Sequence, residues 1–365
     1  MPAQHKRRLS AILLTCLTYA PGCDCTVDAS KSVTAAQVEA TLSTTLLKAQ
    51  VAEVTELTAV SIASDEVPGS GNDVQLTTAE RLRKTLEHLC QTIGERNTTK
   101  PRRISESVAY LTESLESMSY QVERQTFEVS AIECHNLSTE VQGKDKPTEI
   151  VLVGAHYDSA RGTPGANDNG TGVAALLEIA RQMQGKQFSR SIRFALFANE
   201  EPPYFQRDGQ MGSWVYAKRC RTNKDNLKVV LSLETMGYFT DEPNSQKYPP
   251  LLAALYPSTG NFIGVVSDIK SRPLMMQVAK RLKRNCEVDV QSASLPGDLQ
   301  GVGWSDHWSF WQEGYAGVMV TDTALFRYPH YHEQTDTVDK IEFVRYAQVV
   351  DGLAKTIAEF ANDEK

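Results

Sequence analysis

Histidine and acidic side chains recur in this sequence just after strongly apolar segments. Segments 149–155, 191–198 and 229–233 are the clearest apolar runs of this kind. The side chains that follow such segments, or lie in the turns and loops beyond them, are His156, Asp158, Asp168, Glu200, Glu201, Glu234 and His332. Imidazole and carboxylate groups without a thiolate suit a catalytic zinc site, which keeps one coordination position open for water. The pattern therefore predicts metal-dependent hydrolytic chemistry.

Five of these side chains are candidate zinc ligands: His156, Asp168, Glu201, Glu234 and His332. A single catalytic zinc takes three protein ligands, so five ligands fit two zinc ions if one carboxylate bridges them. Three carboxylates contribute a charge of −3 and two zinc ions +4, and one bound hydroxide neutralises the remaining +1. Two metals roughly 3.5 to 4 Å apart could hold both the attacking water and the substrate carbonyl oxygen.

The other two acidic residues suit supporting roles. Asp158 is two residues from His156, so both side chains leave an extended backbone on the same face, where the carboxylate can fix the imidazole tautomer. Glu200 and Glu201 are adjacent and point in opposite directions on an extended backbone. One can hold a metal while the other acts as general base, taking a proton from water and passing it to a leaving amine.

Taken singly, these residues have ordinary interpretations. A strand-end histidine is usually structural, an aspartate at a helix start is usually a cap, and adjacent glutamates usually form a solvated turn. Their joint placement at strand ends favours a site, because ligands gather beyond the carboxyl ends of strands in open α/β sheets.

The elements that must position these side chains alternate between strands and helices. Strands are predicted over 120–129, 133–143, 149–155, 191–198, 229–234, 262–267 and 316–322. Helices are predicted over 79–94, capped by Thr77 or Thr78, over 106–118, capped by Ser105, and over 171–184, 211–220, 273–285 and 341–361. Continuous apolar strands between helices indicate an α/β fold with a mostly parallel sheet that is buried on both faces.

Composition and the N-terminal sequence limit the functional class. The chain has 365 residues, 41% of them hydrophobic, which is enough for a full-sized core. Its net charge of −7 argues against a general nucleic-acid binder. Nowhere does it approach the roughly 20 apolar residues of a membrane span. Residues 1–23 have the basic start and short apolar run of a secretory signal, with a lipoprotein site at Cys23 as an alternative.

The predicted organisation is therefore a signal peptide at 1–23, a propeptide-like or linker segment at 24–75 and a catalytic domain at 76–362. An exported protein is expected, whether secreted, periplasmic or lipid-anchored at the cell surface. Four cysteines within or near the catalytic domain could form disulfides in that setting or remain buried thiols. They are Cys90, Cys134, Cys220 and Cys286.

Several motifs resemble the co-catalytic di-zinc aminopeptidases of metallopeptidase family twenty-eight over roughly residues 76–362. They are "GAHYDS", "PGANDNGTGVAALLEIAR", "FANEEPPYFQRDGQMGS", "SLETMGYF", "SDHWSFWQEGYAGVMVTDTA" and "YPHYHEQTDTVDKI". The resemblance implies a single domain of the zinc exopeptidase fold, with a central mixed sheet flanked by helices, and a peptide substrate with a free N-terminus.

The resemblance also implies roles for individual residues. One zinc would be held by His156 and Glu234, the other by Glu201 and His332, and Asp168 would bridge the two. It further implies that Glu200 is the general base and that Asp158 orients His156. Tyr331 matches a position that donates to the oxyanion in some members. Many members carry aspartate where this chain has Glu234, so the longer side chain can shift that metal.

The sequence leaves the roles of two further histidines open. His307 is either structural or lines the substrate pocket with Trp304 and Trp308. His330 competes with His332 as a ligand, although the residues that follow favour His332. The preferred N-terminal side chain of the substrate and the oligomeric state are not indicated.

Three functions other than an aminopeptidase are compatible with parts of this pattern. A glutaminyl-cyclase-like acyltransferase has a similar fold but works with one zinc, and another exopeptidase or amidohydrolase of the same clan would share the motifs. A binding domain on a peptidase scaffold that has lost its chemistry is disfavoured, because all five ligands and the adjacent base are present.

Overall fold

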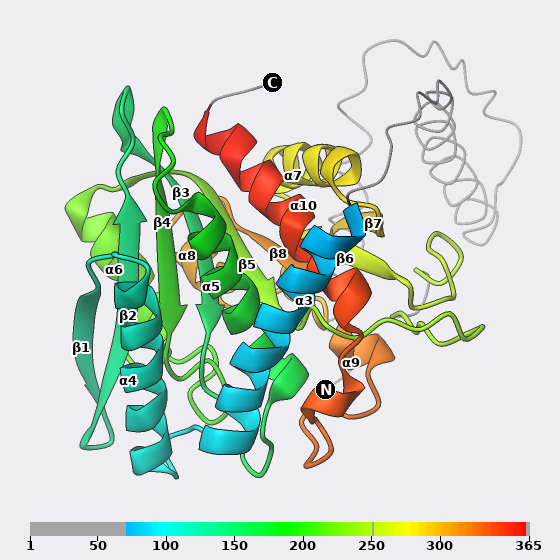
Figure 1. Cartoon of the computed structure of the whole chain (residues 1–365), viewed down its shortest axis with the longest axis horizontal. Coiled ribbons are helices and arrows are strands. Elements are labelled where there is room, and N and C mark those ends of the chain that lie inside the picture. Colours follow the sequence, from blue (N-terminus) through cyan, green and yellow to red (C-terminus); the bar gives the residue numbers. More distant parts are fainter. Residues whose placement is uncertain (1–70, 250–251, 363–365) are drawn as a thin grey trace, which may run out of the picture. The chain divides into compact units, whose positions relative to one another are not determined.

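The computed structural model describes residues 71–249 and 252–362, and an eight-stranded mixed sheet runs through them (Figure 1). Its strands are β1 (Glu123–Val129), β2 (Ile132–Val141), β3 (Lys146–His156), β4 (Arg190–Phe197), β5 (Asn226–Glu234), β6 (Phe262–Ser267), β7 (Asp289–Ser294) and β8 (Val318–Thr321). They are ordered β1-β2-β4-β3-β5-β8-β6-β7. Strands β4, β3, β5 and β8 run parallel, as do β6 and β7, whereas β1 with β2, β2 with β4, and β6 with β8 pair antiparallel. The predicted mixed α/β sheet is confirmed.

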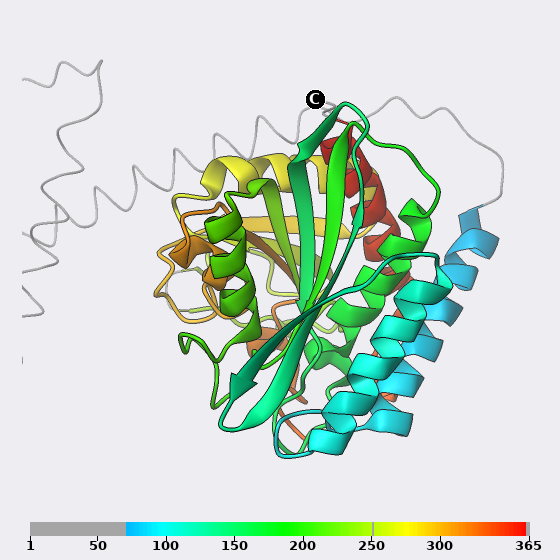
Figure 2. The ribbon, with the colours of Figure 1, turned by 90° about the vertical axis from the view of Figure 1, so that its left-hand side faces the viewer.

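Helices cover both faces of this sheet. They are α3 (Gly71–Glu87), η2 (His88–Ile93), α4 (Pro101–Ser117), η3 (Ala166–Thr171), α5 (Gly172–Met183), α6 (Gly212–Asn223), α7 (Arg272–Asn285), α8 (His307–Gln312), α9 (Ala324–Arg327), η4 (Val338–Lys340) and α10 (Phe343–Ala361). Helices α4, α5, α7 and α10 pack against one face, and α3 packs on α5 and α10. Figure 2 shows α6 on the side of the sheet opposite to α3 and α4.

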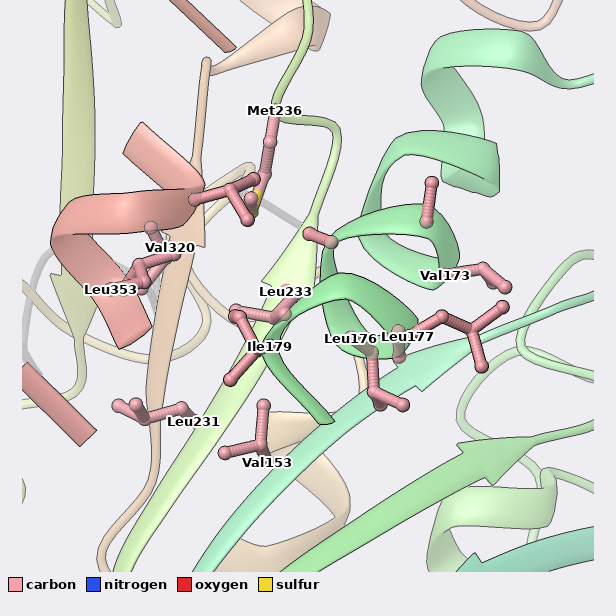
Figure 3. Close-up of a cluster of buried hydrophobic side chains, with 14 of the residues drawn as sticks. Val153, Val173, Leu176, Leu177, Ile179, Leu231, Leu233, Met236, Val320 and Leu353 are labelled. Atoms are coloured by element: carbon pink, nitrogen blue, oxygen red, sulfur yellow. The ribbon is translucent and has the colours of Figure 1, made fainter. Parts of the chain in front are cut away.

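The central strands carry apolar runs that are buried on both faces of the sheet, such as residues 150–153 in β3 and 229–231 in β5. In β3, Val151 and Val153 belong to the larger hydrophobic cluster, with α5 and α10, whereas Ile150 and Leu152 belong to the smaller cluster with α6. Figure 3 shows Val153 and Leu231 of the sheet beside Leu176 and Ile179 of α5. Burying both faces fixes the strand register, because a slip of one residue would exchange the two sets of side chains.

Helix α5 begins directly against the end of β5. A β-carbon added at Gly172, its first residue, would lie 2.4 Å from both the Leu233 carbonyl oxygen and Asn169 Oδ1. Only glycine allows this approach. The Asn169 side chain completes the junction, because its Nδ2 donates to the Leu233 carbonyl oxygen at 2.8 Å. The turn before α5 is thereby held beside the residue that ends β5.

Some predicted element boundaries were wrong. Helix α3 begins at Gly71, so neither Thr77 nor Thr78 caps it, and α4 begins at Pro101 rather than after Ser105. Proline suits a first helical position because its φ is already helical and its missing N–H is not needed there. Ser105 instead lies inside α4 and donates its hydroxyl to the Pro101 carbonyl at 3.0 Å. Strand β7, with the sequence DVQSAS, was not predicted because it is a partly exposed edge strand with few apolar residues.

The described cysteines are free thiols, three of them buried, so the thiol alternative holds for Cys90, Cys134, Cys220 and Cys286. Burial raises the pKa of the Cys90 thiol to about 11 and that of Cys220 to about 12. Among the described helices, none has the length and apolar character needed to cross a bilayer. The predicted signal peptide and most of the predicted linker, up to residue 70, lie outside the described residues.

Candidate metal centre

The parallel strands bring the predicted site residues to one edge of the sheet. Strand β3 ends at His156 and β5 ends at Glu234, and the turn after β4 carries Glu200 and Glu201. Because β4, β3 and β5 are hydrogen-bonded neighbours that run parallel, their carboxyl ends lie side by side. The site is therefore assembled by sheet topology from residues that are far apart in the sequence.

A first group of ligand atoms consists of His156, Asp168 and Glu234. His156 Nε2 lies 3.2 Å from Glu234 Oε2 and 3.6 Å from Asp168 Oδ1. All three residues are buried, and one ligand atom of each lies within 4.8 Å of the others. Ser305 holds the glutamate in place, because its hydroxyl donates to Glu234 Oε2 at 2.7 Å.

A second group shares the same aspartate. His332 Nε2 lies 3.0 Å from Asp168 Oδ2 and 3.2 Å from Glu201 Oε2, and these atoms also fall within 4.8 Å of one another. Asp168 thus offers Oδ1 to the first group and Oδ2 to the second. It is nearly fully buried between them. This is the geometry of a bridging carboxylate.

The two groups could each hold a metal ion. With zinc–nitrogen and zinc–oxygen bonds of about 2.0 to 2.1 Å, tetrahedral ligands stand about 3.3 Å apart. The separations from 3.0 to 3.6 Å between histidine and carboxylate atoms agree with this spacing. In addition, Glu201 Oε1 is buried without a hydrogen-bond partner among the described residues. A buried carboxylate oxygen of this kind is costly unless a cation compensates it.

Glu200 and Asp158 lie beside the two groups without belonging to either. Glu200 Oε2 is 3.9 Å from His156 Nε2, and the side chain is buried. Asp158 Oδ1 is 3.5 Å from His156 Nδ1, on the far side of the imidazole ring. The Asp158 carboxylate also accepts the backbone N–H groups of Glu200 and Glu201, each at 3.1 Å. One side chain therefore supports both the histidine and the glutamate turn.

The crowded carboxylates create a strong demand for positive charge. Burial raises the pKa of Glu201 to about 7, and Asp168 adds to this effect while His332 opposes it. Burial also raises the pKa of Glu200 well above its usual range, with further contributions from Glu234 and Glu201. Burial disfavours the charged form of His332, but its bonds to Asp168 and Glu201 raise its pKa to about 11. Metal ions would satisfy the same electrostatic demand.

Left-handed backbone conformations flank the ligands. Asn199, which precedes the glutamate pair, has a φ of 59°, Thr235, which follows Glu234, has 43°, and His332 itself has 59°. Such angles are uncommon in residues other than glycine, and they cluster at functional sites where the surrounding structure enforces them.

Of the two histidines considered as the last ligand, only His332 reaches a ligand group. His332 reaches the second group, whereas His330 Nδ1 lies 2.8 Å from Thr335 Oγ1. Tyr331 stacks on the ring of His332 with the centroids 4.0 Å apart. Tyr331 and Glu234 are also among the residues that line a cavity of about 110 Å³.

Trp304 lines this cavity, but His307 does not. His307 is fully buried, and its Nε2 lies 2.8 Å from the Val302 carbonyl oxygen. Burial lowers the His307 pKa to about 4, so the ring is neutral and donates its Nε2–H to that carbonyl. Of the two roles considered for His307, its burial and its bond to Val302 favour the structural one over the substrate pocket. Trp308 lies against Trp214 and lines a different cavity.

Sequence reasoning missed residues that support the site from other parts of the chain. Ser305 and Asp306 precede α8, and Asp306 is buried near the first group, where burial raises its pKa to about 7. Both belong to the motif SDHWSFW, which was the available signal. Arg96 binds the Gly165 carbonyl and Asp336 accepts the backbone N–H of Asp168, and no local pattern in the sequence marks Arg96 as special.

The carboxyl edge of the sheet thus carries two adjacent groups of histidine and carboxylate side chains that share an aspartate. This arrangement is of the kind that metal-dependent hydrolases use. Comparison with known proteins makes this more specific. The chain belongs to peptidase family M28, whose model matches residues 136–357. It is accordingly a metallopeptidase of the exopeptidase type.

Two similar proteins accompany this family match. The chain is 35% identical over 283 residues to the uncharacterized protein YfbL of Escherichia coli strain K12, covering 75% of this chain and 86% of that protein. It is 26% identical over 242 residues to leucine aminopeptidase 1 of Arthroderma otae, covering 61% of this chain. The match spans 58% of the length of that aminopeptidase.

Solved structures share the fold. The zinc aminopeptidase BSAP from Bacillus subtilis superposes with a TM-score of 0.63 at 16% identity, covering 82% of this chain and 97% of that one. A glutaminyl cyclase from Fimbriiglobus ruber superposes with a TM-score of 0.57 at 20% identity, covering 82% and 99%. The same scaffold thus occurs in two chemistries, and the site residues must distinguish them.

Proposed function

We propose that this chain is a zinc-dependent aminopeptidase that binds two zinc ions and hydrolyses the N-terminal peptide bond of peptides. The observation that carries the proposal is the position of Asp168, which directs one oxygen to each of two ligand groups. One group contains His156 and Glu234, and the other contains Glu201 and His332. The printed names of a leucine aminopeptidase and a zinc aminopeptidase among the similar proteins support the same activity.

The residues around these groups would transfer the proton, position the ligands and stabilise the oxyanion. When bound, the zinc ions would polarise the substrate carbonyl and lower the pKa of water. Glu200, buried beside the first group, would take the proton of the attacking water at its carboxylate and deliver it to the leaving amine. Asp158 would keep the Glu200 backbone and the His156 ring in place through its hydrogen bonds and ionic contact. Tyr331 would donate its hydroxyl to the developing oxyanion.

The cavity beside the site would receive the N-terminal side chain of the substrate. Phe262, Val266 and Met319 are among the apolar residues that line it. Two tyrosine hydroxyls on its wall are already paired, because the Tyr256 hydroxyl donates to the Ser292 carbonyl at 3.1 Å and the Tyr248 hydroxyl donates to the Pro257 carbonyl at 2.6 Å. Such a lining offers little to a charged side chain and favours an apolar one.

A panel of aminoacyl nitroanilides tests this assignment. We expect kcat/KM for leucyl and phenylalanyl substrates to exceed that for the glycyl substrate by about 10- to 150-fold, which corresponds to 1.5–3 kcal/mol for burying such a side chain. Lysyl and glutamyl substrates should fall well below leucyl. An N-blocked leucyl anilide serves as the matched control and should not be cleaved. A preference for glycyl or lysyl substrates would contradict the assignment of this cavity.

The second ligand group favours this proposal over a one-zinc acyltransferase. A one-zinc enzyme has no need for two ligand groups that share a carboxylate, yet the ligand atoms of Asp168, Glu201 and His332 lie within the same 4.8 Å of one another as those of the first group. Export of the protein, predicted from residues 1–23, is part of the same proposal.

A further inference from the structure

The backbone that carries Asp168 is held from one side by a buried arginine. Arg96 is fully buried, and its Nε donates to the Tyr157 carbonyl oxygen at 2.8 Å. One Nη donates to the Gly165 carbonyl at 2.7 Å, and the other donates to the Pro164 carbonyl. The same guanidinium therefore binds the chain just after His156 and just before η3.

The same backbone is also held, closer to Asp168, by the buried carboxylate of Asp336. Asp336 Oδ1 accepts the backbone N–H of Asn167 at 2.8 Å, and its Oδ2 accepts that of Asp168 at 3.1 Å. The Tyr328 hydroxyl donates to Asp336 Oδ1 at 2.7 Å. Asp336 lies on the same loop as His332. It therefore ties the backbone of the shared ligand to the segment that supplies the second histidine.

The loop between these two contacts is folded back tightly. Gly165 has a φ of 61°, and a β-carbon there would lie 2.4 Å from the Asp168 carbonyl oxygen. Burying a guanidinium costs free energy that these carbonyl bonds must offset. Arg96 reaches these three carbonyls from three different nitrogens of its rigid fork, whereas the donors of a lysine all lie on one nitrogen and cannot span the same positions. The geometry of the loop thus depends on arginine specifically.

We propose that Arg96 and Asp336 are positioning residues that together hold Asp168 where its two oxygens face the two ligand groups. Arg96 binds the carbonyl oxygens of Pro164 and Gly165, and Asp336 binds the amide hydrogens of Asn167 and Asp168. The inference rests on the proposed function, because it concerns the placement of the shared zinc ligand. Its consequence is that zinc affinity depends on two residues that do not themselves contact the metals.

Zinc binding to the metal-free protein tests the proposal. We compare the wild type with Arg96→Lys and Asp336→Asn, measuring zinc affinity by competition with a chromogenic chelator and the free energy of unfolding by urea denaturation. Asp336→Asn keeps the side-chain shape but places an amide N–H₂ against a backbone N–H. Loss of supporting bonds around ligands weakens metal binding by roughly 10- to 100-fold, so we expect the Kd of at least one zinc to rise by that factor in each variant.

Arg327→Lys is the matched control. Arg327 is also a buried arginine, and it donates to Gln246 Oε1 at 2.7 Å and to the Phe262 carbonyl at 2.8 Å, away from Asp168. We expect this variant to lose stability and keep wild-type zinc affinity, which separates positioning from general destabilisation. Excess zinc should restore turnover in Arg96→Lys, whereas it should leave the turnover of Arg327→Lys unchanged.

The outcomes are distinguishable. If Asp336→Asn and a folded Arg96→Lys bind both zinc ions as tightly as the wild type, the positioning role is overturned while the proposed function stands. If Arg96→Lys does not fold, Asp336→Asn alone decides the question in the same way. If the wild type itself fails to bind two zinc ions, the proposed function fails, and the inference fails with it.

Discussion

Glu200→Gln is expected to lower kcat by about 100- to 10,000-fold, the usual contribution of a positioned general base, while both zinc ions stay bound. Glutamine has the shape of glutamate but cannot accept a proton at pH 7. Glu200 lies in neither ligand group, so the metals should not depend on it. The measurement is kcat on leucyl nitroanilide together with zinc content by elemental analysis.

The adjacent residue supplies the control for this prediction. Glu201→Gln changes a side chain whose Oε2 lies 3.2 Å from His332 Nε2, so it should reduce zinc content as well as activity. The two neighbouring glutamates are therefore expected to differ in metal retention rather than in turnover. Wild-type turnover in Glu200→Gln would show that another group moves the proton.

Asp168→Asn should have the second large effect, the loss of zinc binding. Asparagine offers one carbonyl oxygen and an N–H₂ group, so it cannot give an anionic oxygen to each of the two groups. We expect the zinc content to fall from two to one or none, with loss of turnover. Bound zinc stabilises the folded state, so added zinc should raise the Tm of the wild type far more than that of the variant.

An exposed aspartate provides the comparison for that experiment. Asp339→Asn alters a side chain on the surface of η4 whose partners are Lys340 and Thr337. It should keep two zinc ions, full turnover and the zinc-dependent rise in Tm. Two zinc ions bound to Asp168→Asn with wild-type affinity would refute the bridging role.

The strand ends could be predicted from the sequence because burial on both faces leaves a strong signal. A continuous apolar run followed by a polar turn marks the end of β3 and of β5, and it places His156 and Glu234 correctly at one edge of the sheet. Edge elements leave a weaker signal. Strand β7 has few apolar residues, and α3 and α4 begin at Gly71 and Pro101, before the serine and threonine residues considered as caps.

Residues that support the site by binding backbone atoms far away in the sequence could not be predicted in this way. Arg96 contacts Gly165 through folding of the chain, and its local sequence contains nothing that distinguishes it from a surface arginine. His307 posed a related problem, because its place between two tryptophans in the sequence left both a pocket role and a structural role open, and only its burial in the fold favours the second. Only the three-dimensional packing separates these cases.

Zinc titration into the metal-free protein, with the products identified by mass spectrometry, tests the central claim most directly. The substrates are leucyl nitroanilide, its N-blocked form and a peptide that begins with glutamine. The account predicts that chelator abolishes release of the unblocked leucine, that activity returns at two zinc ions per chain, and that the blocked substrate is untouched. Cyclisation of the glutamine peptide without cleavage, or full activity at one zinc per chain, would contradict it.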